Sequence, residues 1–234
     1  MYSSDLLATP LSALLVTIGS YSVALWFQKK LRGNSYCNPA VVAILLVVMY
    51  LFFFNVPYEK YLQGVNFINT LLGTATVALA IPLYDQIYAI KGSTKAIVLS
   101  IVSTCIIAAI SSYFLAGYLG ASDDIKFSIM PKSVTVPIAI GIAEKIGREP
   151  SLAVFFVFTT GIIGSLMAPF IFKLFKVVDE KSIGLSLGAT CHGLGLVRAF
   201  QYSRTAGVFA TIGMSLMGLM SGIILPMVIL NFLI

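Results

Sequence analysis

Residues 191–198 read CHGLGLVR, and this stretch lies inside an apolar run long enough to reach across a membrane. It contains the single histidine of the chain, His192, together with Gly193, Gly195 and Arg198. Each glycine lowers helix propensity by roughly 1 kcal/mol relative to alanine. Two glycines beside a histidine therefore predict a helix that is locally interrupted. Unwound backbone at membrane depth must line a cavity or be buried in protein.

The whole chain has the composition of an integral membrane protein. Of its 234 residues, 59% are hydrophobic and 10% are charged, and the net charge is +6. A soluble domain is typically about 25% charged, so a soluble domain, a disordered chain and a nucleic-acid-binding protein are excluded. The basic residues are scattered, as in cytoplasmic loops. The three cysteines Cys37, Cys105 and Cys191 form neither a CxxC pair nor a disulfide framework, and no metal site is expected.

Seven apolar stretches are long enough to span a membrane. They cover 11–28, 39–55, 66–89, 96–119, 151–173, 183–200 and 206–232. An eighth stretch, 129–147, carries two prolines and three charged residues, and we expect it to be re-entrant. The expected fold is an all-α integral membrane protein with about seven transmembrane helices and this re-entrant segment, in a single polytopic domain over 1–234. The first stretch precedes Lys29 and Lys30 without a cleavage site, so it predicts an uncleaved span with the N-terminus outside.

The positive charges in the loops support the re-entrant segment. Lys173, Lys176 and Lys181 place their loop inside the cell only if 129–147 enters and leaves the membrane on the same side. Arg204, in a short turn predicted to lie outside, disagrees with this topology.

Two segments resemble each other at an offset of 115 residues: LGTATVALAIPLYDQ over 72–86 and LGATCHGLGLVRAFQ over 187–201. The predicted topology runs them in opposite directions, so 39–119 and 151–232 are candidate inverted repeats. Inverted repeats with interrupted helices in matching positions are typical of secondary transporters. The alternative is that both segments are ordinary glycine-rich helices that pack closely.

Charged side chains at membrane depth are rare and usually functional. Arg198 can hold a carboxylate through two hydrogen bonds, His192 can titrate near neutral pH, and Lys132 supplies a second cation. The alternatives are a neutral His192 bonded within the bundle, an Arg198 that extends to the interface, and a Lys132 among the lipid head groups.

The stretch PKSVTVP, residues 131–137, places a proline on each side of polar residues. Prolines interrupt a helix and free backbone carbonyls, which can then act as ligands beside the hydroxyl groups. The predicted substrate-binding residues are Lys132, Ser133, Thr135, His192, Gly193, Gly195, Arg198, Asn38, Thr74 and Thr76. The predicted structural breaks are Pro39, Pro82, Pro131 and Pro137. The sequence contains no nucleophile–base pair and no nucleotide-binding loop, so we expect neither an enzyme nor a cofactor.

Four blocks resemble the LrgB/CidB family of bacterial membrane proteins. They are LLGTATVALAIPLY (71–84), MPKSVTVPIAIGIAEKIG (130–147), GIIGSLMAP (161–169) and LGATCHGLGLVRAF (187–200). The resemblance covers nearly the whole chain. Cys191 departs from it, because a small polar residue such as serine is expected there.

The resemblance implies two alternative functions. The family is described as holin- or antiholin-like, regulating murein hydrolase export and autolysis with a small LrgA/CidA-type partner. Relatives are also associated with transport of small monocarboxylates such as pyruvate, and a plastid relative with glycolate and glycerate. Buried cations, interrupted helices and inverted halves suit a carrier, so we expect a transporter of pyruvate-, lactate- or glycolate-type substrates. A holin-like pore or regulator is the alternative. We expect a homodimer in the lipid bilayer of the bacterial cytoplasmic membrane, without nucleic acid.

Overall fold

The computed structural model describes residues 9–30, 39–78, 81, 84 and 91–232, which form helices and turns without a β-strand. This confirms an all-α membrane fold. Helices long and apolar enough to cross a membrane cover Pro10–Lys30, Thr94–Tyr118, Pro150–Leu174, Glu180–Tyr202 and Arg204–Asn231. The chain divides into two compact units, Met1–Ala75 and Thr76–Ile234, which are described separately.

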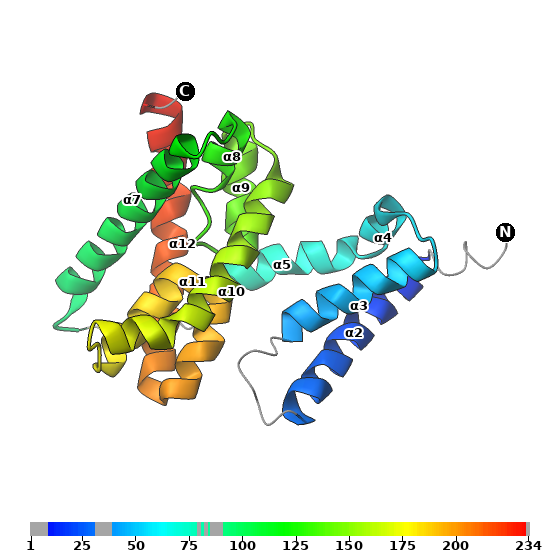
Figure 1. Cartoon of the computed structure of the whole chain (residues 1–234), viewed down its shortest axis with the longest axis horizontal. Coiled ribbons are helices and arrows are strands. Elements are labelled where there is room, and N and C mark those ends of the chain that lie inside the picture. The colour runs from blue at the N-terminus through cyan, green and yellow to red at the C-terminus, as the bar shows by residue number, and fades with distance from the viewer. Residues whose placement is uncertain (1–8, 31–38, 79–80, 82–83, 85–90, 233–234) are drawn as a thin grey trace. The chain divides into compact units, whose positions relative to one another are not determined.

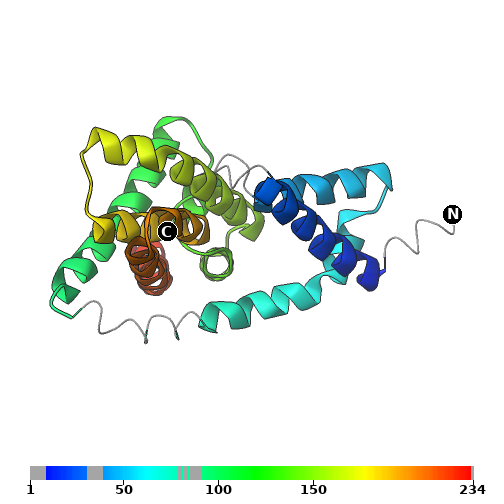
Figure 2. The same ribbon diagram turned by 90° about the horizontal axis from the view of Figure 1, so that it is seen from below.

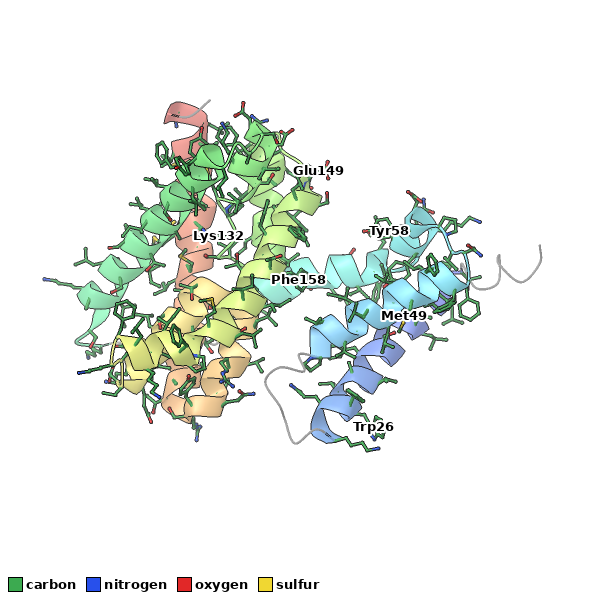
Figure 3. All side chains as sticks on the ribbon, in the orientation of Figure 1. Trp26, Met49, Tyr58, Lys132, Glu149 and Phe158 are labelled. Carbon is green, nitrogen blue, oxygen red and sulfur yellow. The ribbon has the colours of Figure 1, made fainter. Side chains whose placement is uncertain are left out.

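The first unit contains α2 (Pro10–Lys30), α3 (Pro39–Phe53), α4 (Tyr58–Gly64) and most of α5 (Asn66–Ala78). Gly64 allows α4 to approach α2, because a Cβ atom at Gly64 would lie 2.6 Å from the Cβ of Ala13. The hydroxyl oxygens of Thr17 and Tyr61 also lie 2.8 Å apart. Many other side chains of α2 and α3 are exposed and apolar, as lipid contact requires (Figure 3).

The helices of this unit match the predicted spans unevenly. α2 covers the predicted span 11–28. α3 has 15 residues and is about 22 Å long, which is shorter than the roughly 30 Å core of a bilayer. In the predicted span 66–89, the structure describes α5 as far as Ala78. The predicted inverted repeats 39–119 and 151–232 stay a prediction, because the first extends over both units and over residues outside the described ranges.

The second unit contains three long helices that match predicted spans. They are α7 (Thr94–Tyr118), α10 (Pro150–Leu174) and α12 (Arg204–Phe232), and the shorter elements between them are α8 (Asp123–Ser128), α9 (Val136–Lys145) and α11 (Glu180–Tyr202). α7 and α12 run in the same direction, and α10 runs in the opposite direction (Figure 1). The Sγ of Cys105 in α7 lies 3.3 Å from the Oγ of Ser221 in α12. In Figure 2 this unit is seen from below, with α12 nearly end-on.

Residues 123–148 enter this unit and return, and we call them the first hairpin. The two ends meet because Arg148 Nη1 donates to Asp124 Oδ1 at 2.7 Å. The middle lies deep, because Lys132 Nζ donates to the carbonyl oxygen of Ala108 at 2.7 Å. Ala108 is ten residues before the end of α7, which corresponds to roughly 15 Å. The hairpin thus reaches about halfway through a bilayer core of about 30 Å, as the predicted re-entrant segment 129–147 requires.

α11 is bent back on itself, and we call residues 180–202 the second hairpin. Its helical path is broken at His192, whose backbone angles are φ 43° and ψ −129°. After the break the chain returns alongside the first arm, because a Cβ atom at Gly195 would collide with the carbonyl of Leu187. In a straight helix, residues eight apart are separated by about 12 Å along the axis.

Contacts with α12 establish the same reversal independently. Cβ atoms at Gly184 and Gly188 would collide with the carbonyls of Ala206 and Ala210, so α12 starts beside the beginning of α11 and runs parallel to it. A straight α11 would separate Gly184 from Tyr202, four residues before Ala206, by about 27 Å along the axis. Residues 180–202 therefore have the length and composition of a span, but the chain returns to the end at which it entered. This differs from the single crossing predicted for 183–200.

The two hairpins enter the second unit from opposite ends. The mouth of the first hairpin lies where α7 ends and α10 begins (Figure 1). The mouth of the second lies where α10 ends and α12 begins, and the rings of Phe172 and Tyr202 pack there with centroids 6.0 Å apart. One apolar cluster, which extends along α7 and α12, includes Val134 at the tip of the first hairpin and Ala189, three residues before the tip of the second, whereas Leu187 and Cys191 belong to another cluster.

Candidate functional site

Lys132 is the charged residue at the tip of the first hairpin. In Figure 3 it lies in the interior of the second unit, away from the end marked by Glu149. Its ammonium donates to Ala108 O, the same carbonyl that accepts from Ser112 Oγ at 2.8 Å. Among the described residues, no carboxylate lies within ion-pairing distance of Lys132. The structure therefore holds a cation at membrane depth through a neutral backbone group.

The prolines of the tip act as the sequence predicts. Pro131 is fully buried in the turn, and Pro137 lies in the first turn of α9, where a missing N–H is tolerated. Thr135 is the N-cap residue of α9, but its side chain does not cap the helix, and its buried Oγ1 has no hydrogen-bond partner. Ser133 is also buried. The positive end of the α9 dipole thus points toward the tip, with a free hydroxyl beside it.

His192 forms the tip of the second hairpin, and its side chain is 6% exposed. Its Nε2 lies 2.9 Å from the carbonyl oxygen of Val157 in α10. A carbonyl oxygen only accepts, so Nε2 carries the hydrogen and Nδ1 is the nitrogen that can take up a further proton. A positive φ at a non-glycine residue is strained and persists only when the surrounding structure enforces it.

Two glycines of α10 that we did not predict as site residues make room for this tip. A Cβ atom at Gly161 would lie 2.7 Å from both Cε1 and Nε2 of His192, and one at Gly164 would collide with the Sγ of Cys191. The signal in the sequence was the GIIG pattern at 161–164, which places two small residues on neighbouring positions of one helix face.

The glycines of the second hairpin have different roles. Gly195 allows the two arms to touch, whereas a Cβ atom at Gly193 would meet no other atom within 4 Å. Arg198 lies on the returning arm, six residues after the tip, and its Nη1 donates to Gln201 Oε1 at 2.6 Å. Its guanidinium also lies 5.7 Å from the centre of the Tyr202 ring. Arg198 therefore lies toward the mouth of the second hairpin, and the described contacts do not join it to Lys132.

The remaining predicted residues lie before α7 in the sequence. Thr74 Oγ1 donates to the Leu71 carbonyl of its own helix at 2.9 Å. Pro39 is the first residue of α3, so it starts that helix and does not interrupt it. Asn38, Pro82 and the side chain of Thr76 lie outside the described residues.

Capping interactions close the mouth of the second hairpin. Asp179 Oδ2 accepts hydrogen bonds from the backbone N of Ser182 at 2.8 Å and from its Oγ at 2.7 Å. These bonds stabilise the carboxylate and lower the pKa of Asp179. Ser203 Oγ accepts from the backbone N of Ala206 at 3.0 Å and so caps α12. At the other mouth, a hydrogen bond from Lys126 lowers the pKa of Asp123.

Sequence comparisons relate the chain to known proteins. The model of the LrgB-like family matches residues 17–230. An uncharacterized protein of Haemophilus influenzae is 33% identical over 213 residues, which cover 91% of this chain and 92% of the relative. The uncharacterized protein YwbG of Bacillus subtilis is 33% identical over 207 residues, covering 88% and 90% of the two chains. The holin-like protein CidB of Staphylococcus aureus is 29% identical over 219 residues, covering 94% and 95%.

No solved structure matches the chain significantly. The family match includes α7, α10, α12 and both hairpins, and it extends over most of the sequence. This multi-pass membrane protein therefore belongs to the LrgB-like family.

Proposed function

We propose that this protein is a carrier for small monocarboxylates of the pyruvate, lactate or glycolate type and that it is not an enzyme. The observation that carries the proposal is the pair of hairpins, which enter from opposite ends and both contribute to the apolar cluster that extends along α7 and α12. Interrupted helices whose ends meet near the membrane midplane are a recurring way for transporters to bind substrate. Alternating access then requires only that one hairpin move relative to the rest of the bundle.

Lys132 and His192 have separate roles in this proposal. Lys132 has no carboxylate partner among the described residues, so a substrate carboxylate can supply the missing negative charge. The N-terminus of α9 adds partial positive charge at the same tip. His192 can carry a proton on Nδ1 while Nε2 stays bonded to Val157. Because Arg198 lies toward the second mouth, we assign it to capture of the anion at that end.

Loop charges suggest which mouth faces the cytoplasm. Six basic residues lie at the end where α7 and α12 begin: Lys91, Lys95, Lys173, Lys176, Lys181 and Arg204. Three lie at the other end, Lys126, Lys145 and Arg148, among four carboxylates. The positive-inside rule therefore favours a cytoplasmic second mouth. The reversal at His192 also brings Arg204, which disagreed with the predicted topology, to this basic end.

A holin-like pore or regulator of murein hydrolase export is the alternative, favoured by the printed name of the Staphylococcus aureus relative. An open pore needs a polar lining, whereas the cluster to which both tips contribute is apolar and buried. This favours the carrier. We further propose a homodimer in the bacterial cytoplasmic membrane, acting with a small LrgA/CidA-type partner and thereby linked to autolysis.

Uptake of labelled pyruvate, lactate and glycolate into proteoliposomes, with and without a pH gradient, tests the proposal. A leak assay with a small dye is run on the same vesicles. We expect saturable uptake that responds to the gradient while the dye is retained. Dye release without saturable uptake would support the pore. If neither signal is seen, the measurement is repeated with the small partner, and silence there contradicts the carrier.

Substitution of the tip residue makes the test specific. Lys132→Gln is expected to lower uptake at least tenfold, because the buried carboxylate loses its positive partner. Lys145→Gln is the matched control, since Lys145 is exposed at the end of α9 in the same hairpin. Uptake that is equally affected by both substitutions, in folded protein, would remove Lys132 from the site.

A further inference from the structure

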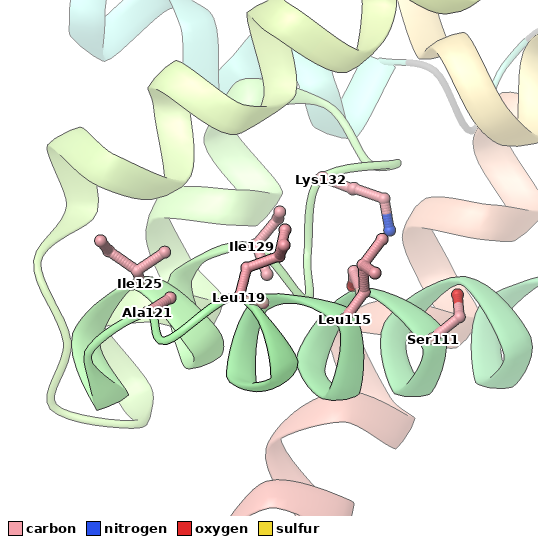
Figure 4. A pocket seen from close by; sticks show the side chains of 9 residues that line it. Ser111, Leu115, Leu119, Ala121, Ile125, Ile129 and Lys132 are labelled. Atoms are coloured by element: carbon pink, nitrogen blue, oxygen red, sulfur yellow. The ribbon is translucent and has the colours of Figure 1, made fainter.

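A cavity of about 410 Å³ lies between α7 and the first hairpin, and Lys132 is at its inner end. Its walls include Leu115 and Leu119 of α7 and Ile125 and Ile129 of the hairpin (Figure 4). Leu119 and Ile125 lie near the end of α7, whereas Lys132 lies at the level of Ala108. The cavity therefore runs from an apolar outer part to a cationic inner end.

None of the residues that line the cavity is acidic. A lysine ammonium has three donor hydrogens, and only one acceptor, Ala108 O, is found for Lys132 among the described residues. The neighbouring Ser112 hydroxyl already donates to the carbonyls of Ala108 and Ala109, so it offers no hydrogen to a ligand. Ser111, which also lines the cavity, donates to the same Ala108 carbonyl, and the other lining residues apart from Lys132 and Ser112 are apolar. A single cation in a mainly apolar cavity fits a ligand with one negative charge and few hydroxyl groups.

The direction of this polarity distinguishes a water-soluble acid from a lipid. A fatty acid in a bilayer keeps its carboxylate near the surface and its chain in the core. The cavity has the opposite order, with the cation about 15 Å from the end of α7 and the apolar walls nearer that end. A small acid that enters with its carboxylate first matches this order.

We propose that this cavity is the substrate site of the proposed carrier and that it prefers monocarboxylates with an apolar body to dicarboxylates and to monocarboxylates with several hydroxyl groups. The inference rests on the proposed function for its substrate class. Each methylene buried against Leu115 and Ile129 improves binding about fourfold. A hydroxyl group or a second carboxylate in the outer part loses its hydration there without finding a donor.

The test is pyruvate counterflow in proteoliposomes, with a protonophore present so that permeating acids cannot impose a pH gradient. Unlabelled acetate, propionate, butyrate, glycerate and succinate compete at a pH at which all are ionised. We expect inhibition to strengthen about fourfold per methylene from acetate to butyrate, with glycerate and succinate at least tenfold weaker than butyrate. Equal inhibition by acetate, propionate and butyrate, or glycerate as the best competitor, would contradict the proposed preference but not the proposed carrier function.

Two variants locate the effect. Leu115→Ala is expected to flatten the series from acetate to butyrate, whereas Lys132→Gln weakens all monocarboxylates together. Leu99→Ala is the control, because Leu99 is 67% exposed on α7, close to the 60% of Leu115, but does not line the cavity. If inhibition still strengthens from acetate to butyrate in Leu115→Ala as in the parent protein, the preference arises elsewhere, and the assignment of the substrate site to this cavity is wrong.

Ligand-induced shifts of the melting temperature in detergent separate the two hypotheses. Absence of counterflow for every substrate contradicts the carrier. The order in which butyrate, glycerate and succinate raise the melting temperature then tests the ligand preference of the cavity independently, because binding is measured without transport. Decanoate that stabilises the protein more than butyrate, with the effect lost in Lys132→Gln, would instead make the cavity a lipid site.

Discussion

The first hairpin turns over seven residues, 129–135, whereas the second turns at the single residue His192. The long turn has room for a buried proline and for a lysine that reaches α7. The tight turn has room for one imidazole, which fits against Gly161 of α10. The lysine is therefore on the hairpin with the long turn, and the histidine is on the one with the tight turn.

The hairpins also differ in how they are held. The first packs through side chains, with seven buried apolar residues between Phe127 and Ile146 in the core cluster, and the Asp124–Arg148 and Lys132–Ala108 contacts add to this packing. The second is held along its length by glycines in direct contact with backbone, Gly184 and Gly188 against α12 and Gly195 against its own first arm. Backbone packing leaves no side chain that can rearrange. We infer that the second hairpin is the more rigid of the two and that the first moves more readily.

The largest expected effect concerns the reversal of the second hairpin. In a protein whose Cys37, Cys105 and Cys191 are replaced by alanine, Glu180→Cys and Arg204→Cys should react with a membrane-impermeant thiol reagent from the same side. Glu149→Cys should react only from the opposite side, because α10 crosses between them. The measurement is labelling of intact and of opened vesicles.

Each of these cysteines is expected to be labelled from one side of the membrane only. If Glu180→Cys and Arg204→Cys react from opposite sides, α11 crosses the membrane and the second hairpin does not exist in the bilayer.

The next largest effect is expected for Gly188→Ala. Its Cβ atom would collide with the Ala210 carbonyl, and backbone cannot move away cheaply, so we expect a loss of about 3 kcal/mol, the upper part of the range for overpacking. Thermal unfolding in detergent measures it. Gly141→Ala in the first hairpin is the matched control, because its Cβ meets nothing within 4 Å, and it should leave the protein unchanged or stabilise it by up to about 1 kcal/mol. Equal effects would remove the distinction between the hairpins.

Gly161→Ala should have a smaller effect, about 1 kcal/mol, because the group it meets is the His192 ring rather than backbone. Displacing the ring also lengthens the bond from Nε2 to Val157, so proton-dependent uptake should fall more than stability does. Gly161→Ala combined with His192→Ala should recover stability but not proton dependence. Additive losses of stability in the double variant would show that the two residues do not interact.

The smallest effect is a pH dependence at the mouth of the second hairpin. Hydrogen bonds from Ser182 lower the pKa of Asp179 below its ordinary value of 3.8. The stabilisation is therefore present above that value and is lost as the pH falls through the lower pKa of the folded state. Asp179→Asn should lower the melting temperature slightly at pH 7 and converge with the parent protein below about pH 4, so its fall in acid should be smaller. The same acid profile in both proteins would contradict a role for this cap.

Much of the fold could be predicted from the sequence. The long apolar stretches predicted α7, α10 and α12 to within two residues at most ends, because hydrophobic length is what a bilayer selects. The prolines around Lys132 predicted the re-entrant segment, and the glycines around His192 predicted the break in α11. Each of these sequence features determines the structure of the segment in which it occurs.

The missed features depend on distant partners. The direction of the chain after His192 is set by the contacts of Gly184 and Gly188 with α12, and no pattern within 183–200 encodes them. The partner of Lys132 is a backbone carbonyl, which every residue has, so the sequence could not single out Ala108. The reversal also places Arg198 toward the mouth of the second hairpin, and the substrate-binding roles of Lys132 and Arg198 stay predictions.

The two reversals also determine whether the number of membrane crossings is odd or even. A hairpin that leaves on the side where it entered adds residues without adding a crossing, so α7, α10 and α12 are the crossings among the described residues 91–232. Three crossings are an odd number, and a reporter attached before α7 and one attached after α12 should face opposite compartments. An ancestral gene could therefore gain or lose either hairpin without inverting any segment that follows it.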